Sequence, residues 1–167
     1  MPKALVEGGA WVRRAVAALT DGGCDPVLVV LGAAGDQAAP LVPDTAVTVL
    51  APDWAEGMGA SLRAGLTALA GSAGPQVQAA LVHLIDLPDV DASVVGRLVA
   101  LAGPTVVARA VFDGQPGHPV LLGRQHWAAV AASASGDRGA RDWLAARTDL
   151  ILVDCSDLAS GMDVDRP

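Results

Sequence analysis

The chain has 167 residues with 11 basic and 18 acidic side chains, a formal net charge of −7, and a hydrophobic content of 52%. This length suits one domain, which we place at residues 1–167, and the hydrophobic content is that of a globular chain and not a disordered one. The acidic balance argues against a nucleic-acid polymer as partner, because phosphate backbones are bound through clustered Lys and Arg.

Helical and strand patterns alternate along the chain. Apolar residues at helical spacing indicate helices, and short apolar runs rich in Val, Ile and Leu indicate buried strands. In chain order, we expect a helix at 9–21, a strand at 27–31, a helix at 36–42, a strand at 45–50, a helix at 61–70, a strand at 79–85, a helix at 91–102, strands at 105–111 and 120–122, helices at 124–132 and 138–147, and a strand at 150–153. Strands separated by helices predict a mostly parallel sheet covered on both faces.

The sequence lacks the usual patterns of a membrane span and of a secretory signal. No apolar run approaches the roughly 18 residues of a membrane span, and residues 1–14 contain no apolar core of a secretory signal. Cys24 and Cys155 are far apart and fit no CxxC pattern. We therefore expect a cytoplasmic protein with two thiols and no membrane partner.

Two acidic positions are candidates for a metal. Asp86 follows an apolar run, where α/β sheets place their ligands, and a carboxylate there suits a hard cation such as Mg²⁺. Asp163 and Asp165 fall on one side of the chain if that segment is extended. The alternatives are a turn or N-cap role for Asp86 and a solvated tail for the other two.

Gly57 and Gly59 allow a ligand to approach the backbone closely, and Ser61 is placed to cap the helix that follows. Because a helix N-terminus favours an anionic group, this segment is a candidate phosphate site. The alternative is a loop-to-helix turn without a ligand.

Three further polar residues stand in turn-rich segments. His118 lies between Gly117 and Pro119, where an imidazole could donate to a phosphate, act as a base or serve structure alone. Asp137 and Arg141 belong to a Gly-Asp-Arg-Gly-Ala-Arg run that opens a helix. That run suits either an anion site or a capped, solvated first turn.

Taken in order, these segments resemble the MobA-like nucleotidyltransferase family, and more narrowly its molybdenum cofactor cytidylyltransferase branch. The resemblance spans nearly the whole chain. Each motif is weak alone, but six in the family's order are strong. They are Pro-Lys-Ala-Leu-Val at 2–6, Gly-Met-Gly-Ala-Ser-Leu-Arg at 57–63, Asp-Leu-Pro at 86–88, Gly-His-Pro-Val-Leu at 117–121, Gly-Asp-Arg-Gly-Ala-Arg at 136–141 and Asp-Val-Asp-Arg-Pro at 163–167.

The resemblance implies a Rossmann-like three-layer α/β/α fold and transfer of a nucleoside monophosphate, CMP from CTP in the closest branch, onto the phosphate of a molybdopterin-type cofactor. It also implies a molybdoenzyme or its chaperone as protein partner. The roles that it implies are a phosphate-neutralising Lys3; a nucleotide pocket of Gly57, Met58, Gly59 and Ser61; Mg²⁺ on Asp86 and Asp165; and acceptor binding by His118, Asp137 and Arg141.

The sequence departs from the family pattern at both ends. Members of the family have a strand and a glycine-rich loop of the form LAAGxGxRxG just before the Pro-Lys pair, and this sequence begins at Met1. We expect either roughly 20 further residues upstream, one strand plus a loop, or a shortened protein that has lost transfer. Near the other end, Arg166 replaces the usual Thr of an Asp-Thr-Pro motif.

Two other functions remain open from the sequence. The same pattern resembles family members called nicotine blue oxidoreductases, which reduce quinone-like dyes with NAD(P)H, although no dinucleotide fingerprint GxGxxG follows a strand here. A non-catalytic cofactor-binding domain is the third possibility.

Overall fold

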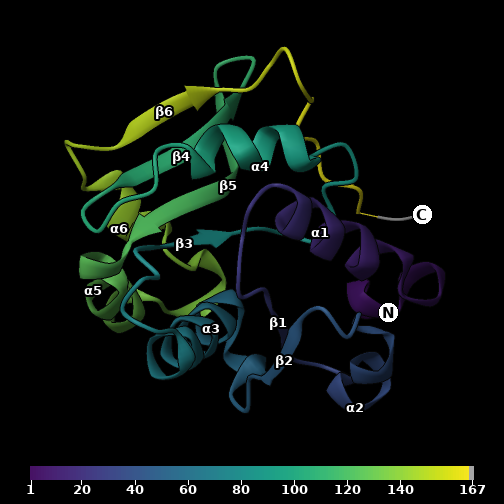
Figure 1. Cartoon of the computed structure of the whole chain (residues 1–167). Coiled ribbons are helices and arrows are strands. Elements are labelled where there is room, and N and C mark those ends of the chain that lie inside the picture. Colours follow the sequence, from purple (N-terminus) through teal and green to yellow (C-terminus); the bar gives the residue numbers. More distant parts are fainter. Residues whose placement is uncertain (166–167) are drawn as a thin grey trace.

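A computed structural model describes residues 1–165 and contains two β-sheets (Figure 1). The strands pair as a two-stranded sheet, β1-β2, and a four-stranded sheet of order β3-β5-β4-β6. The strands are β1 (Leu28–Leu31), β2 (Val47–Leu50), β3 (Ala79–Val82), β4 (Val107–Phe112), β5 (Gln115–Gly123) and β6 (Ile151–Asp154). The pairs β1-β2 and β4-β6 are parallel, whereas β5 runs antiparallel to both of its neighbours.

Helices connect most of these strands. The α-helices are α1 (Ala10–Asp21), α2 (Gly35–Ala38), α3 (Met58–Ser72), α4 (Ala92–Val99), α5 (Trp127–Ser133) and α6 (Arg141–Ala145). Short 3₁₀ segments are η1 (Lys3–Gly9), η2 (Ala39–Leu41), η3 (Trp54–Glu56), η4 (Arg124–His126) and η5 (Gly136–Arg138). The alternation of strands and helices expected from the sequence is confirmed.

The sheets form the middle of a three-layer α/β/α arrangement (Figure 1). On one face, residues of α3, α5 and α6 pack with Ala80, Val120 and Leu122. On the opposite face, Val94 and Leu98 of α4 pack with β4, and α1 covers β1 through a separate cluster. Side chains alternate across a strand, so burial on both faces explains the mostly apolar sequence of β4, whereas most residues of β2 and β6 are exposed.

The hairpin β4-β5 is where local expectation and structure differ most. The sequence predicts a strand over 120–122 only, with Gly117, His118 and Pro119 in a turn. In the structure all three belong to β5, which is nine residues long. The turn is instead Asp113-Gly114, with φ angles of 48° and 77°. Two successive positive φ values suit a two-residue hairpin turn, and Asp-Gly is its usual sequence.

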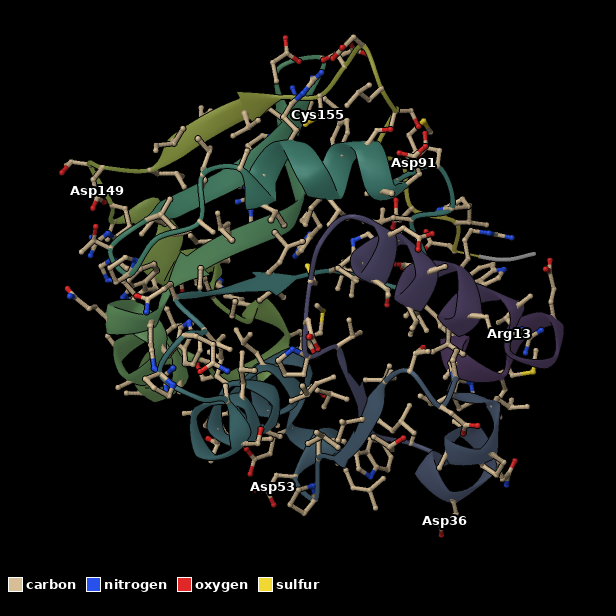
Figure 2. All side chains as sticks on the ribbon, in the orientation of Figure 1. Arg13, Asp36, Asp53, Asp91, Asp149 and Cys155 are labelled. Carbon is tan, nitrogen blue, oxygen red and sulfur yellow. The ribbon has the colours of Figure 1, made fainter. Side chains whose placement is uncertain are left out.

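Smaller differences concern where elements begin and end. Helix α3 begins at Met58, three residues before the predicted start, and β3 ends at Val82 and not at residue 85. Asp91 is the N-cap of α4, and its carboxylate accepts a hydrogen bond of 2.8 Å from the Ser93 amide (Figure 2). Among residues 1–165, no helix combines the length and the hydropathy that a bilayer crossing requires.

We predict that Leu122→Ala lowers the free energy of unfolding by about 2–5 kcal/mol, because the side chain is fully buried in the core and truncation leaves a cavity. Leu152→Ala is the matched control, since Leu152 on β6 is 60% exposed, and it should change stability by less than about 0.5 kcal/mol. Urea unfolding measures both; equal effects would contradict the assignment of the core.

Candidate functional site

An ion pair between Lys3 and Asp86 joins residues 83 positions apart. The Asp86 side chain is 8% exposed, whereas the Lys3 side chain is 43% exposed. The Lys3 Nζ atom also lies 4.0 Å from Oδ1 of Asp165. Segment η1, the turn after β3 and the C-terminal segment therefore bring three of the predicted site residues together. Backbone pairing supports this arrangement, since the Val164 amide donates to the Asp86 carbonyl at 2.9 Å.

The acidic surroundings favour the charged form of Lys3. Its pKa is raised above the ordinary value, first by the hydrogen bond to Asp86, although burial acts in the opposite direction. The negative charges of Asp86, Asp165 and Asp163 raise this pKa further. Lys3 is therefore a permanent cation at neutral pH.

The two carboxylates at this site can provide some of the oxygen ligands that a hard divalent cation needs. Asp86 and Asp165 provide oxygen donors close to one ammonium group, and Mg²⁺ is held by one or two carboxylates, with water and substrate phosphate completing its shell. Across residues 1–165, no group of three or more His, Cys, Asp or Glu side chains is arranged to hold a metal by itself. This donor set therefore suits a cation shared with a bound phosphate and not a closed protein cage.

Two half-buried histidines lie close enough to Asp86 for its negative charge to act on both imidazoles. Burial lowers the pKa of His118 to about 4, and the charge of Arg109 acts in the same direction. Burial also lowers the pKa of His83 to about 4, with a smaller contribution from His118. Arg109 of β4 donates to the Gly117 carbonyl from Nε at 3.2 Å and from Nη2 at 3.0 Å, which fixes the backbone before His118.

The two glycines of the Gly-Met-Gly motif are required by the protein's own packing. A Cβ on Gly57 would lie 2.5 Å from Oδ1 of Asp137. A Cβ on Gly59 would lie 2.6 Å from the Ser135 amide nitrogen. The structure therefore brings Gly57 and Gly59 against the turn that carries Asp137, so two separately predicted parts of the site are neighbours.

The start of α3 differs from the expected capping. Gly57 is the N-cap residue and provides no side-chain hydrogen bond, so the prediction that Ser61 caps this helix is wrong. The physical reason is that α3 begins at Met58, which places Ser61 inside its first turn. The amides of Met58 and Gly59 thus belong to a helix N-terminus without a side-chain cap, a backbone arrangement that favours anions.

A cleft of about 700 Å³ lies beside these parts. Ala4, Met58, Ser61, His83 and Ile85 all line it. These residues are neighbours of Lys3, of Gly57 and Gly59, and of Asp86 in the chain. Met58 and Ser61 of the predicted nucleotide segment therefore line this space, whereas Lys3 and Asp86 of the predicted metal site are not part of its lining.

A second cavity, of about 360 Å³, lies beyond the carboxyl ends of the parallel strands β1 and β2. Leu31, Gly32, Leu50 and Trp54 contribute to its lining. In Figure 2, Asp36 of α2 and Asp53 in the turn after β2 mark the segments that follow these strands. Ligands of open α/β sheets bind at this edge, so the cavity extends the candidate site.

Some predicted residues are not brought to the ion pair. Arg141 is the first residue of α6 and is exposed, and no hydrogen bond or ion pair within residues 1–165 joins it to Lys3 or Asp86. Arg166 and Pro167 of the last motif lie outside the described residues.

The sequence predicts no individual role for Arg109 and Arg63, and it leaves open whether His83 belongs to the core or to the site. Arg63 donates to Oε2 of Glu56 at 2.9 Å and to the Ala134 carbonyl at 2.8 Å, which ties the segment before α3 to the segment after α5. A single polar residue inside an apolar strand run was the available signal for Arg109 and His83.

Comparison with known proteins adds to this geometry. The model of the family described as MobA-like NTP transferase domain matches residues 2–150. Nicotine blue oxidoreductase of Paenarthrobacter nicotinovorans is 35% identical over 177 residues, an alignment that covers 98% of this chain and 83% of that protein.

Solved structures share the fold at lower identity. Rv0371c from Mycobacterium tuberculosis H37Rv is similar with a TM-score of 0.77 at 20% identity, over 99% of this chain and 84% of that one. The structure of the Rv0371C complex with manganese has a TM-score of 0.76 at 22% identity, over 99% of this chain and 86% of that one. The Rv0371c homolog from Mycobacterium sp. strain JC1 has a TM-score of 0.78 at 22% identity, over 99% of this chain and 82% of that one.

We predict that Gly59→Ala lowers the free energy of unfolding by about 1–3 kcal/mol, because the new methyl group would overlap the backbone of Ser135. Gly71→Ala in the same helix is the control: its Cβ meets nothing within 4 Å, and stability should rise by about 0.4–1 kcal/mol. Chemical denaturation tests the pair. A Gly59→Ala protein as stable as the parent would show that the two segments are not in close contact.

Stability should fall on acidification through the buried imidazoles. The pKa of His83 is about 4 in the folded protein and about 6.5 in an unfolded chain. Between these values the unfolded state binds more protons, so the free energy of unfolding decreases as the pH falls from about 6.5 to about 4 and is unaffected by this group above that range.

Unfolding of the parent and of His83→Gln at pH 7 and pH 5 measures this effect, and the variant should lose less stability between them. His126→Gln is the control, since His126 lies on η4 with its ring nitrogen against the Thr105 carbonyl. The same pH dependence in the parent and in His83→Gln would refute the prediction.

Proposed function

The chain belongs to the MobA-like NTP transferase family, and we propose that it uses a divalent cation to transfer CMP from CTP onto the phosphate of a molybdopterin-type cofactor. The observation that carries this proposal is the convergence of Lys3, Asp86 and Asp165, to which the N-terminus of α3, without a side-chain cap, adds free amides elsewhere in the fold. A cation, two carboxylates and free amides are the groups that phosphoryl chemistry uses.

The reaction needs no protein nucleophile. An oxygen of the acceptor phosphate forms a bond to the α-phosphorus of the nucleotide, the bond from that phosphorus to the bridging oxygen breaks, and pyrophosphate leaves. Catalysis then consists of alignment and of neutralising charge on the phosphates. Lys3 contributes a full positive charge at neutral pH, and the amides of Met58 and Gly59 contribute partial ones.

Asp86 and Asp165 would hold the cation, which we propose to be Mg²⁺. When bound, a divalent cation neutralises the triphosphate and draws its oxygens into a fixed geometry. The Lys3 ammonium group forms an ion pair with Asp86 and lies 4.0 Å from Oδ1 of Asp165. We expect its ammonium group to turn from Asp86 toward phosphate when the nucleotide arrives.

The remaining assignments follow the layout of the cavities. The cavity beside Trp54 suits the nucleoside, because it lies at the carboxyl ends of β1 and β2 and adjoins the segment that leads to Gly57. His118, Asp137 and Arg141 are proposed to bind the acceptor, with His118 acting as a neutral imidazole. We place the enzyme in the cytoplasm, with a molybdoenzyme or its chaperone as the receiver of the product.

A second candidate is favoured by one observation, the 35% identity to a protein named nicotine blue oxidoreductase. This alternative is NAD(P)H-dependent reduction of a quinone-like compound. It differs from transferase activity in consuming NADH without releasing pyrophosphate, so the two candidates can be assayed side by side on one preparation.

We predict that the protein, given Mg²⁺ and molybdopterin, releases pyrophosphate faster with CTP than with GTP or ATP, and that chelation of the metal stops the reaction. Asp86→Asn should lower the rate by roughly two to three orders of magnitude, because a buried carboxylate at the site is lost. Asp21→Asn, an exposed change at the end of α1, is the matched control and should leave the rate unchanged.

Pyrophosphate release is followed with a coupled enzyme assay, and NADH absorbance is followed in parallel with a quinone-like acceptor. Turnover that persists in Asp86→Asn would remove this residue from the metal site. NADH oxidation without pyrophosphate release would replace the first candidate with the second.

A further inference from the structure

Residues 155–165 follow β6 and carry Asp165 to the candidate site without forming a helix or a strand. This C-terminal segment has no ladder of backbone hydrogen bonds to fix its path, so its position depends on individual contacts with the rest of the protein. The Asp165 side chain is 85% exposed, so burial does not hold it either. The contacts made earlier in the segment therefore decide how closely its carboxylate approaches Lys3 and Asp86.

The first half of the C-terminal segment is fixed by packing and by one ion pair. Leu158 and Ala159 pack against the core cluster that contains Leu87 of the turn after β3. Asp157 pairs with Arg97 of α4, with 2.6 Å between Oδ1 and Nη1. These contacts place the segment against the turn that carries Asp86, but they end at residue 159.

Asp89 makes the next connection. It is an exposed residue of the same turn as Asp86 and lies three positions after it. Its Oδ2 atom accepts one hydrogen bond from the Ser160 amide at 2.7 Å and a second from Ser160 Oγ at 2.6 Å. Ser160 Oγ in turn accepts from the Met162 amide at 3.2 Å. Hydrogen bonds to a carboxylate are stronger than neutral ones, so this side chain ties together residues 71 positions apart.

The path beyond Ser160 is also constrained. Gly161 has a φ of 66°, in the left-handed region that glycine adopts without strain, and a Cβ at this position would overlap the ring of Phe112. The segment then reaches the candidate site, where the Val164 amide donates to the Asp86 carbonyl at 2.9 Å. The backbone from residue 160 to residue 164 is thus tied at both ends to the turn after β3.

Two short pieces of chain therefore each carry one metal-site carboxylate and one partner of the same connection. The turn after β3 carries Asp86 and Asp89, and the C-terminal segment carries Asp165 and Ser160. Because each piece is only a few residues long, the bonds between Asp89 and Ser160 limit how far the other two side chains can separate.

We propose that Asp89 is a positioning residue that, through Ser160, holds the Asp86 and Asp165 carboxylates close enough to share one divalent cation. Asp89 contacts neither the cation nor the nucleotide. This inference rests on the proposed function, which assigns the two carboxylates to one metal. Residues that orient metal ligands from outside the coordination shell typically change metal affinity by about 10- to 100-fold when they are replaced.

The test measures binding of Mn²⁺ and CTP to the full chain. Mn²⁺ takes the same oxygen ligands as Mg²⁺, and it quickens the relaxation of water protons further when its CTP complex binds to the slowly tumbling protein. Asp89→Ala should weaken this binding at least about tenfold. Ser160→Ala, which removes one of the two hydrogen bonds without changing the charge, should weaken it about three- to tenfold.

Two further variants separate position from charge. Asp89→Asn keeps an acceptor oxygen but loses the negative charge, and it should retain affinity within about threefold of the parent. Asp91→Asn removes the same charge two positions away and keeps an N-cap for α4, so it should change the affinity less than about twofold. Weakening by Asp89→Asn or Asp91→Asn as large as that by Asp89→Ala would overturn the proposal, since charge alone would then explain the effect.

Hydrogen exchange tests the connection without metal or nucleotide. In Asp89→Ala, the Val164 amide should exchange at least about fivefold faster than in the parent, because the segment that carries it is released. The Val95 amide of α4, which donates to the Asp91 carbonyl at 3.2 Å, is the internal control and should not change. Unchanged exchange at Val164 would overturn the proposal, because other contacts would then hold the segment.

The binding data distinguish this inference from the proposed function. Binding of Mn²⁺ and CTP by the parent with the same affinity in Asp89→Ala would overturn the positioning role alone and leave the proposed function standing. A parent protein that shows no binding of Mn²⁺ and CTP would refute the metal site of the proposed function, and the positioning role with it.

Discussion

Helix α3 is the element on which the rest of the structure depends, because it packs against both sheets. Leu66 is part of the core beneath the four-stranded sheet, whereas Gly65 lies so close to β1 that its Cβ would be 3.0 Å from Cγ2 of Val30. The same helix begins with Gly57 and Gly59, which fit against the turn carrying Asp137. One helix therefore fixes the spacing of the sheets and the position of the candidate phosphate site.

Local electrostatics at the site run against the charge of the whole chain. A protein with a net charge of −7 disfavours anions at long range, yet Lys3 lies at the carboxyl end of β3 with its positive charge stabilised by neighbouring acids. Asp86 is buried and has the lysine as its partner, which avoids the cost of an isolated buried charge. Nucleotide and cation would exchange these partners without leaving either side chain unpaired.

The candidate site and the cleft of about 700 Å³ differ in chemistry. The site presents the charged groups of Lys3, Asp86 and Asp165, whereas the lining of the cleft is mostly apolar. The match to the family model over residues 2–150 establishes the family of the chain, and the similarity to the Rv0371c structures concerns the shared three-layer arrangement.

The sequence alone determined the order of helices and strands, the apolar strands, and the candidate carboxylate after β3, since these depend on local periodicity and turn residues. Only the tertiary structure decided that β5 runs antiparallel, that the strands divide into two sheets, and that Lys3 meets Asp86. Periodicity specifies which side of an element is buried, but not which element covers it. Strand order and contacts between distant residues are set by long-range packing, which no short stretch of sequence encodes.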